Sequence, residues 1–334
     1  MRGLTRNVGT THTKIKPGDN ADFKRVLIIR PNNRLGNLLM ITPLLQEVTE
    51  FFPQCTIDLF VRGNLAPVLF KNYSNIGRII KLPAKPFKHL IGYAAAWISI
   101  KRKRYDLVIN VVPNSSSGRL STKFANARYK IFGDVNEQVK EDCNNYEHVA
   151  RYPVCNLREF MAMFGKDRLS EPVPDLNLRP APDELSEGKK LLHELVRGDK
   201  PVIAIFTYAT GTKCYSCDWW GPFYERLKIE FPQFEIVEVL PAENVSQINF
   251  TAPSFYSRDI RQLGAFIANT ALFIGADSGI MHLASAVGTP TVGLFSVTNP
   301  VAFRPYNNGS IAIDTREGDM DAWIAAITGV IKSV

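Results

Sequence analysis

Short apolar runs, each followed by a segment long enough for a helix, recur along this chain of 334 residues. Such uninterrupted runs are typical of strands that are buried on both faces of a parallel sheet. The alternation therefore predicts an α/β fold with helices on both faces of the sheet. In the first half, the expected strands are 26–30, 56–61, 79–82, 106–112 and 129–132, with a first helix over 38–48.

A proline-rich stretch, residues 171–182, predicts a linker, after which the alternation starts again. The expected strands are 202–206, 234–240, 272–275 and 291–295, and the expected helices are 183–197, 222–230, 259–268, 278–287 and 321–332. We expect two Rossmann-like, doubly wound parallel-sheet domains that face a cleft, with ligands at the carboxyl ends of the strands. The predicted division is a mobile basic tail (1–22), a first domain (23–175), a second domain (176–320) and a C-terminal helix (321–334).

Composition excludes several classes of protein. The longest apolar run, 90–100, is too short for a membrane-spanning helix, and the first twenty residues lack the apolar core of a secretory signal. Five cysteines, an odd number in a chain of this size, argue against a disulfide scaffold. These features favour a cytoplasmic protein.

Charge is distributed unevenly along the chain. Residues 1–180 hold 28 Lys and Arg against 15 Asp and Glu, whereas residues 181–334 hold 12 against 17. This asymmetry indicates an anionic partner for the first half, or a solvated basic face without a partner. Zinc-finger spacing and aromatic RNA-binding signatures are absent from the sequence, so we expect no nucleic acid. Residues 81–104 place seven Lys and Arg around an apolar centre, which suits either a helix on an anionic bilayer or a helix packed within the first domain.

The segment 273–290 carries the strongest candidate site. A strand is expected to end near Gly275, and Asp277, Ser278 and Gly279 stand where the next helix begins. Free backbone N–H groups and the positive end of the helix dipole suit a diphosphate there, and His282 follows one turn later on the same face. The alternative is a structural role, in which Asp277 caps the helix and His282 packs inside the fold.

Residues 277–290 resemble the D-[ST]-G-x-x-H-x-A-x-A-x-G-x-P signature of the bacterial heptosyltransferases, glycosyltransferase family 9. Residues 30–48 resemble the opening strand, loop and helix of the same family, and 52–61 continue the match. The resemblance implies a GT-B architecture, with the acceptor on the first domain and the nucleotide-sugar on the second. It also implies an inverting transferase that uses neither a metal nor a cofactor and takes ADP-heptose or another nucleotide diphosphate-sugar as its donor.

One position departs from the family pattern. Asn37 stands where the family usually has an Asp that the resemblance implies to be the general base. An amide is no useful proton acceptor near neutral pH, although it can orient an acceptor hydroxyl. Another carboxylate could supply the base, and Asp277 is the closest candidate among the motif residues. Alternatively, the leaving diphosphate could help to remove the proton, or the protein could be catalytically weak. Arg34, with Asn33 beside it, is a candidate for binding acceptor phosphate or carboxylate.

A loop after the strand 202–206 offers further donor contacts. The resemblance implies a lysine there that faces the donor phosphates, and Lys213 is the candidate, with Thr210 and Thr212 as hydroxyl donors. The alternative is a solvated lysine with turn-forming threonines. Cys214 and Cys217 form a single C-x-x-C, which lacks the two further ligands of a zinc site, so we expect free thiols and no metal.

The sequence therefore predicts an inverting glycosyltransferase that moves a sugar, with heptose as the first candidate, to an anionic glycolipid of the lipopolysaccharide-core or lipid A type. The implied setting is the cytoplasm, with peripheral contact to the inner-membrane surface. Two alternatives stay open: a catalytically degenerate GT-B protein that binds or scaffolds, and a nucleotide-sugar epimerase.

Overall fold

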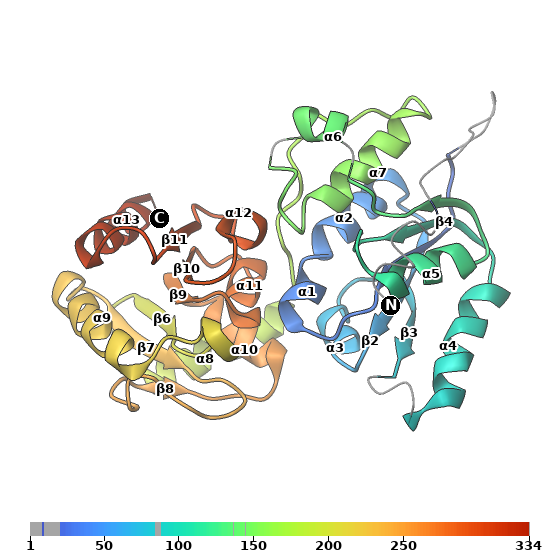
Figure 1. Ribbon diagram of the computed structural model, residues 1–334. Helices are drawn as coiled ribbons and strands as arrows, with labels where there is room; N and C mark the ends of the chain where they lie inside the picture. Colours follow the sequence, from blue (N-terminus) through green and yellow to red (C-terminus); the bar gives the residue numbers. More distant parts are fainter. Residues whose placement is uncertain (1–8, 10–20, 84–87, 136, 144, 334) are drawn as a thin grey trace. The chain divides into compact units, whose positions relative to one another are not determined.

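The computed structural model describes residues 9, 21–83, 88–135, 137–143 and 145–333. Within them the chain divides into two compact units, Met1–Pro174 and Asp175–Val334. Each unit holds its own parallel sheet with helices on both faces, so the predicted pair of Rossmann-like α/β folds is confirmed (Figure 1). The predicted tail 1–22 lies outside the described residues except for Gly9, Ala21 and Asp22.

The sheet of the first unit has the strand order β3-β2-β1-β4-β5, and all four pairings are parallel. Its strands are β1 (Arg25–Arg30), β2 (Thr56–Arg62), β3 (Ile76–Leu82), β4 (Tyr105–Asn110) and β5 (Ala127–Ile131). This is the order of a doubly wound fold, in which the winding direction reverses between β1 and β4. Ligands of such folds bind beyond the carboxyl ends of the strands at that reversal.

The described residues of the first unit also form seven α-helices. They are α1 (Leu35–Leu39), α2 (Thr42–Phe51), α3 (Ala66–Leu69), α4 (Leu90–Arg102), α5 (Ser116–Phe124), α6 (Glu137–Asp142) and α7 (Tyr152–Ala162). The single helix expected over 38–48 is wrong, because two helices, α1 and α2, occupy this region. Pro43 stands in the first turn of α2, where its missing N–H costs nothing but where it favours a new helix start.

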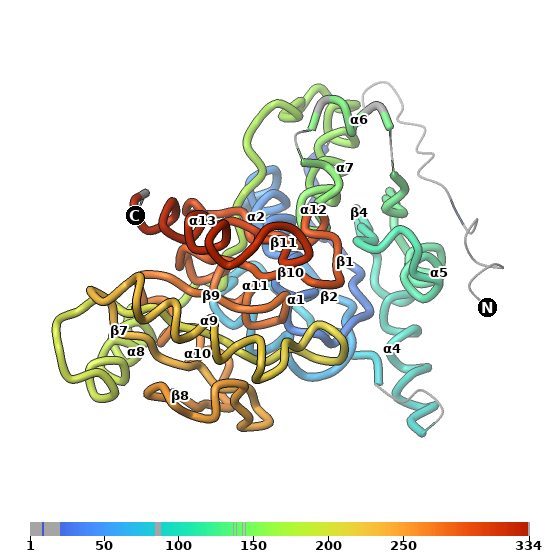
Figure 2. The backbone as a smooth tube through the Cα atoms, turned by 60° about the vertical axis from the view of Figure 1, so that its left-hand side comes forward, coloured from blue at the N-terminus to red at the C-terminus, as the bar shows by residue number. Residues whose placement is uncertain are grey.

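The second sheet has the order β11-β10-β9-β6-β7-β8 and is again wholly parallel. Its strands are β6 (Val202–Phe206), β7 (Glu235–Val239), β8 (Ser254–Phe255), β9 (Leu272–Ala276), β10 (Thr291–Phe295) and β11 (Ile311–Asp314). The winding reverses between β6 and β9, so these two strands define the expected ligand edge. Figure 2 shows the same succession of strands and helices along the chain of this unit.

The helices of the second unit are α8 (Pro182–Leu195), α9 (Cys217–Glu230), α10 (Ile260–Ile267), α11 (Gly279–Ala286), α12 (Pro300–Phe303) and α13 (Met320–Ser333), with a short 3-10 turn over Gly211–Lys213. The expected start of a helix at Pro222 is wrong, because α9 begins at Cys217 and takes Pro222 into its interior. Trp220 and Phe223 are buried on the inner side of α9, and this packing outweighs the one backbone bond that the proline removes.

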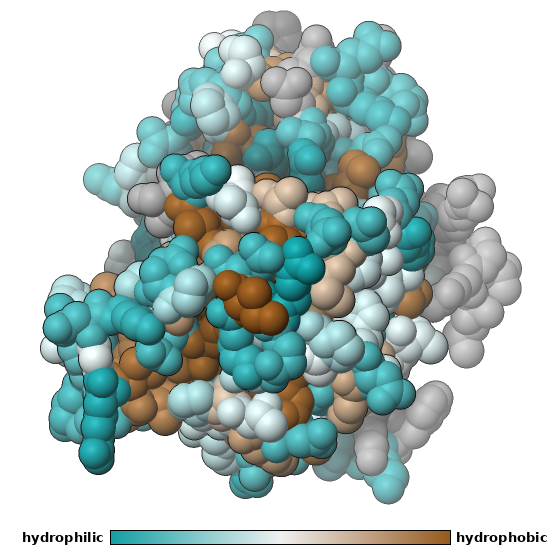
Figure 3. Space-filling model, turned by 90° about the vertical axis from the view of Figure 1, so that its left-hand side faces the viewer, coloured by the Kyte–Doolittle hydropathy of each residue, from teal (hydrophilic) through white to brown (hydrophobic). Residues whose placement is uncertain are grey.

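One face of the second unit is largely polar. Figure 3 shows the side that carries α9, where hydrophilic side chains dominate and apolar ones form patches between them. Large apolar residues that are exposed in this unit include Ile229 (72%) on α9 and Phe250 (53%) in a loop. Isolated exposed residues of this kind are normal for a folded protein.

Cys143 and Cys155 are joined as a disulfide, a pairing that the sequence analysis did not predict. Cys55, Cys214 and Cys217 are free, as predicted for the C-x-x-C pair. Among the described residues, no group of three or more His, Cys, Asp or Glu is arranged to hold a metal ion. None of the described helices is both long enough and apolar enough to span a bilayer.

Candidate donor and acceptor sites

In the second unit, the candidate site lies at the carboxyl end of β9. Asp277 follows this strand directly, and its backbone N–H donates to the carbonyl of Leu294 on β10 at 3.0 Å, which fixes the start of the turn. Ser278 is the N-cap of α11, and its hydroxyl oxygen accepts from the N–H of Met281 at 3.2 Å. The capping role that was one alternative for Asp277 therefore belongs to Ser278.

The Asp277 carboxylate accepts hydrogen bonds from residues that follow two other strands. Its Oδ2 accepts from Lys213 Nζ at 3.0 Å and from Thr298 Oγ1 at 2.6 Å. Lys213 ends the 3-10 turn after β6, and Thr298 follows β10. Asp277 is only 5% exposed, whereas the Lys213 side chain keeps 28% of its surface exposed. One side of the lysine is thus anchored while its remaining N–H groups are available to an anion.

His282 stands one turn into α11 and is buried beneath the same carboxylate. Its Nε2 lies 3.8 Å from Asp277 Oδ1, and its Nδ1 has no hydrogen-bond partner among the described residues. Burial lowers the pKa of His282 to about 4; Asp277 opposes this shift and Lys213 adds to it. The imidazole is consequently neutral near pH 7, with one ring nitrogen available to a ligand.

The first turn of α11 adds unpaired donors to this site. No acceptor among the described residues meets the backbone N–H of Gly279 or of Ile280. Together with Lys213 and the positive end of the helix dipole, these groups form an anion-binding arrangement of the kind that a diphosphate requires. Thr210 and Thr212 are exposed on the Lys213 loop. The structure thus brings together Lys213, Asp277, Ser278, Gly279 and His282, and it adds Thr298, which the sequence analysis missed.

In the first unit, the loop after β1 carries the candidate acceptor residues. Asn33 and Arg34 are exposed, and the Asn32 Oδ1 accepts from the N–H of Arg34 at 2.8 Å, which closes the turn. Asn37 lies in α1 and is half-buried. The structure therefore keeps Asn33, Arg34 and Asn37 on one loop and helix at the carboxyl edge of the sheet.

Asn37 has a partner that sequence reasoning did not find. Arg30, the last residue of β1, donates from Nη2 to Asn37 Oδ1 at 2.8 Å and from Nε to the Asn37 carbonyl at 3.2 Å. Arg30 is 5% exposed, and burial lowers the pKa of its guanidinium. Its Nη1 reaches the carbonyl of Val111, at 3.5 Å, and this carbonyl also accepts from the Tyr152 hydroxyl. A buried cation therefore stands directly behind the Asn37 side chain.

Comparison with known proteins bears on both sites. The model of glycosyltransferase family 9, the heptosyltransferases, matches residues 257–322, which include the whole of the Asp277 turn and α11. The predicted resemblance to this family is confirmed. Lipopolysaccharide heptosyltransferase 3 of Escherichia coli is 22% identical over 292 residues, which cover 83% of this chain and 85% of the relative.

Solved structures show the same architecture. The glycosyl transferase family 9 protein of Veillonella parvula superimposes with a TM-score of 0.71 at 16% identity, covering 94% of this chain and 98% of that protein. The E. coli heptosyltransferase WaaC with ADP-2-deoxy-2-fluoro heptose gives a TM-score of 0.60 at 16% identity, covering 92% and 99%. The fold is thus the GT-B fold of these heptosyltransferases, as the sequence predicted.

Proposed function

We propose that this protein is a glycosyltransferase that moves a sugar from a nucleotide diphosphate-sugar to a lipopolysaccharide-core-type acceptor. Heptose is the first candidate for the sugar, and transfer inverts the configuration of the anomeric carbon. The observation that carries the proposal is the meeting of Lys213, Asp277 and the unpaired N–H groups of α11 at the ligand edge of the second sheet. The heptosyltransferase relatives, and the likeness to WaaC with its bound ADP-2-deoxy-2-fluoro heptose, support this choice of donor.

The donor diphosphate would lie over the first turn of α11. Its oxygens would accept from the N–H groups of Gly279 and Ile280 and from Lys213, while Asp277 holds the lysine in place. When the acceptor oxygen attacks the anomeric carbon, the bond to the diphosphate breaks and its electron pair leaves with the diphosphate. Negative charge then grows on the leaving group, so these fixed donors stabilise the transition state more than the ground state.

The attacking hydroxyl must lose a proton, and we assign its positioning to the first unit. Asn37 would orient the acceptor hydroxyl through its side-chain N–H₂, because its oxygen is already engaged by Arg30. Arg34 and Asn33, exposed on the same loop, would contact anionic groups of the acceptor. The proton would pass to a carboxylate or to the leaving diphosphate, since neither the amide nor the guanidinium can take it. In this proposal the chemistry needs no metal and no cofactor.

A degenerate GT-B protein that binds the donor without transferring it is the second candidate, and the Arg30–Asn37 contact favours it. An amide held by a buried cation lacks the proton-accepting group of the family. An epimerase, the other alternative in the sequence analysis, would use the donor site but no acceptor site.

Donor binding and transfer distinguish these candidates. Thermal unfolding with a panel of nucleotide-sugars should show a raised Tm with ADP-heptose, because a ligand of the native state stabilises it. Labelled donor should then pass its sugar to a lipopolysaccharide-core acceptor. A raised Tm without transfer to any core acceptor would favour the binding protein, and an isomerised donor would favour the epimerase. No Tm shift with any nucleotide-sugar would defeat the proposal.

A further inference from the structure

Helix α4 is apolar on both of its sides. Toward the sheet it packs Ala96 and Ile100, both buried, with the half-buried Tyr93 and Trp97 against the same core. The opposite side is exposed and equally apolar: its residues, spaced by one helical turn, are Leu90, Ile91, Ala94, Ala95 and Ile98. Leu90, Ile91 and Ile98 keep 64%, 88% and 46% of their surface exposed. A helix on the surface of a monomer normally turns charged residues to the solvent, and α4 has none between Leu90 and Ile100.

Cations border this exposed apolar face, which we call the α4 stripe, at both of its ends. Lys88 precedes the helix, while Lys101 and Arg102 close it. The sequence on both sides of the helix is also cationic, because residues 59–105 contain ten Lys and Arg and no Asp or Glu. An apolar face between cationic ends is the pattern of helices that lie in the interface of an anionic bilayer.

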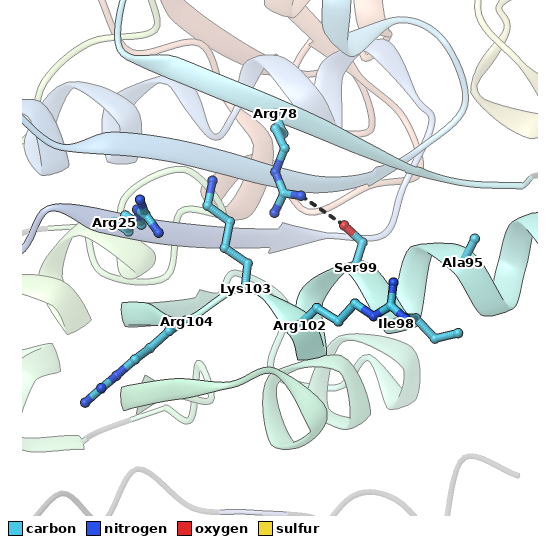
Figure 4. Close-up of a pocket in the computed structure, with 8 residues that line it drawn as sticks. All are labelled: Arg25, Arg78, Ala95, Ile98, Ser99, Arg102, Lys103 and Arg104. Atoms are coloured by element: carbon cyan, nitrogen blue, oxygen red, sulfur yellow. Dashed lines mark hydrogen bonds between the residues drawn. The ribbon is translucent and has the colours of Figure 1, made fainter.

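A cationic cavity of about 720 Å³ continues the stripe at the C-terminal end of α4 (Figure 4). No acidic side chain among the described residues lines it; the lining residues are Arg25, Arg78, Ala95, Ile98, Ser99, Arg102, Lys103 and Arg104. Ala95 and Ile98 belong to the α4 stripe as well, so the apolar surface runs directly into the cavity. A phosphate group in the cavity would have its attached hydrocarbon beside the stripe.

A buried carboxylate fixes two of these cations. Asp58, on β2, is 1% exposed, and its Oδ2 accepts from Arg78 Nε at 3.1 Å and Lys103 Nζ at 3.2 Å. Arg25, Arg102 and Arg104 are exposed and have no ion-pair partner among the described residues. The cavity thus combines two positioned cations with three exposed ones.

We propose that the α4 stripe lies on an anionic lipid bilayer and that the cavity takes the phosphate of a lipid headgroup. The proposal deepens the proposed function, because a glycolipid acceptor requires an enzyme at the membrane, but its evidence is confined to the first unit. A second copy of the chain is a poorer occupant. Two antiparallel α4 helices would place Lys88 of one copy against Lys101 and Arg102 of the other, and like charges repel.

Vesicle cosedimentation tests the proposal without donor or acceptor. Phosphatidylglycerol vesicles should bind the full chain at low salt, whereas phosphatidylcholine vesicles should bind it weakly, and rising salt should weaken the binding. Replacing Arg25, Arg102 and Arg104 together by Ser should weaken it about a hundredfold, since each cation near an anionic surface contributes about fivefold. The matched control removes three cations from the second unit: Lys189, Lys190 and Arg197 to Ser.

The apolar part is tested separately. Leu90→Ser with Ile91→Ser should reduce vesicle binding about tenfold or more. Ile229→Ser with Phe250→Ser, two residues that are also exposed but lie in the second unit, should not. All four residues are exposed, so circular dichroism should show each variant folded. The proposal would be overturned if the cavity variant and its control lost vesicle binding equally, or if the wild type bound no vesicles at low salt.

Two further outcomes also contradict it. A concentration-dependent dimer that the Leu90 and Ile91 substitutions abolish, without vesicle binding, would make the stripe an interface between copies. If the Arg25, Arg102 and Arg104 substitutions leave vesicle binding unchanged, the cavity takes no part in binding the membrane. Sugar transfer to a delipidated core acceptor should be the same in the vesicle-binding variants as in the wild type. A failure of transfer in the wild type and in every variant would refute the proposed function while leaving the vesicle result standing.

Discussion

Arg30 donates its guanidinium N–H to the side-chain oxygen of Asn37 at 2.8 Å, from a position that is 5% exposed. A carboxylate at position 37 would meet this same cation. Replacing Asn37 by Asp would thus change a hydrogen bond to a neutral amide into an ion pair.

We therefore predict that Asn37→Asp stabilises the fold by about 1–2 kcal/mol, because a buried guanidinium gains a counter-charge. The nearby cation would lower the folded-state pKa of the new carboxyl below its unfolded value of about 3.9. The gain should accordingly be complete above pH ~4 and disappear as the pH falls through the lowered pKa. Urea denaturation at pH 7 and pH 3 measures it. Asn33→Asp, exposed on the same loop, is the control and should gain nothing.

Transfer should respond differently from stability. A carboxylate paired with Arg30 is a weak base, so Asn37→Asp should not bring the ~10²–10⁴-fold acceleration of a well-placed general base. Asn37→Ala removes the amide that we propose to orient the acceptor, so it should slow transfer about tenfold or more, measured with saturating donor. An alanine variant with the wild-type rate would show that Asn37 has no part in the reaction.

Lys213 and Asp277 should act as one unit in donor binding. Lys213→Met removes the charge that we propose to face the donor diphosphate, and Asp277→Ala leaves the lysine without its anchor. Each variant should therefore reduce the Tm shift caused by the donor. Because both act through the same contact, the double variant should lose little more than either single one. Titration calorimetry with ADP-heptose checks this. Additive losses would mean that the two residues bind the donor independently.

His282 makes stability depend on pH. Its pKa is lowered from 6.5 in the unfolded chain to about 4 in the fold, so the unfolded state binds the proton first. Stability should therefore fall, by up to about 1.4 kcal/mol per pH unit, as the pH decreases from about 6.5 to about 4. His282→Gln should flatten this slope between pH 4 and 6.5 in denaturant titrations. The same slope in wild type and variant would show that another group causes it.

Glu238 should show the opposite dependence. Its Oε1 accepts from Thr207 Oγ1 at 2.6 Å, whereas its Oε2 is buried without a hydrogen-bond partner among the described residues. Burial raises the pKa of this carboxyl, so its contribution to stability is present at low pH and is lost as the pH rises through the folded-state pKa. Glu238→Gln keeps an acceptor for Thr207 and should be more stable than wild type at pH 8 but not at pH 4. Equal stability at both pH values would contradict this.

Buried strands were the most predictable part of the fold. The expected strands 202–206 and 291–295 coincide with β6 and β10, because strands covered on both faces are continuous apolar runs. β8, of two residues, and β11, at the edge of its sheet, were missed because neither forms such a run. The break between α1 and α2 was also missed, although Pro43 marks it.

Motif residues at the start of α11 were predictable because they are consecutive in sequence. Contacts between distant residues were not. Lys213 and Asp277 are 64 positions apart, and only the pairing of β6 with β9 brings them together. Thr298 could have been found as one of two hydroxyl residues, with Ser296, that closely follow a predicted neighbouring strand. No pattern shows that Arg30 turns back toward Asn37.

Helix α4 connects the parallel strands β3 and β4, so it runs antiparallel to them. A bilayer against its stripe would therefore lie alongside the strands of the first unit and hold their carboxyl edge at a constant height above the lipid. Acceptor sugars at that height would be reached, and those nearer to or farther from the acyl chains would not. The enzyme would then meet its acceptor by diffusion in two dimensions, and diluting the acceptor with inert lipid should slow turnover even at a fixed bulk concentration.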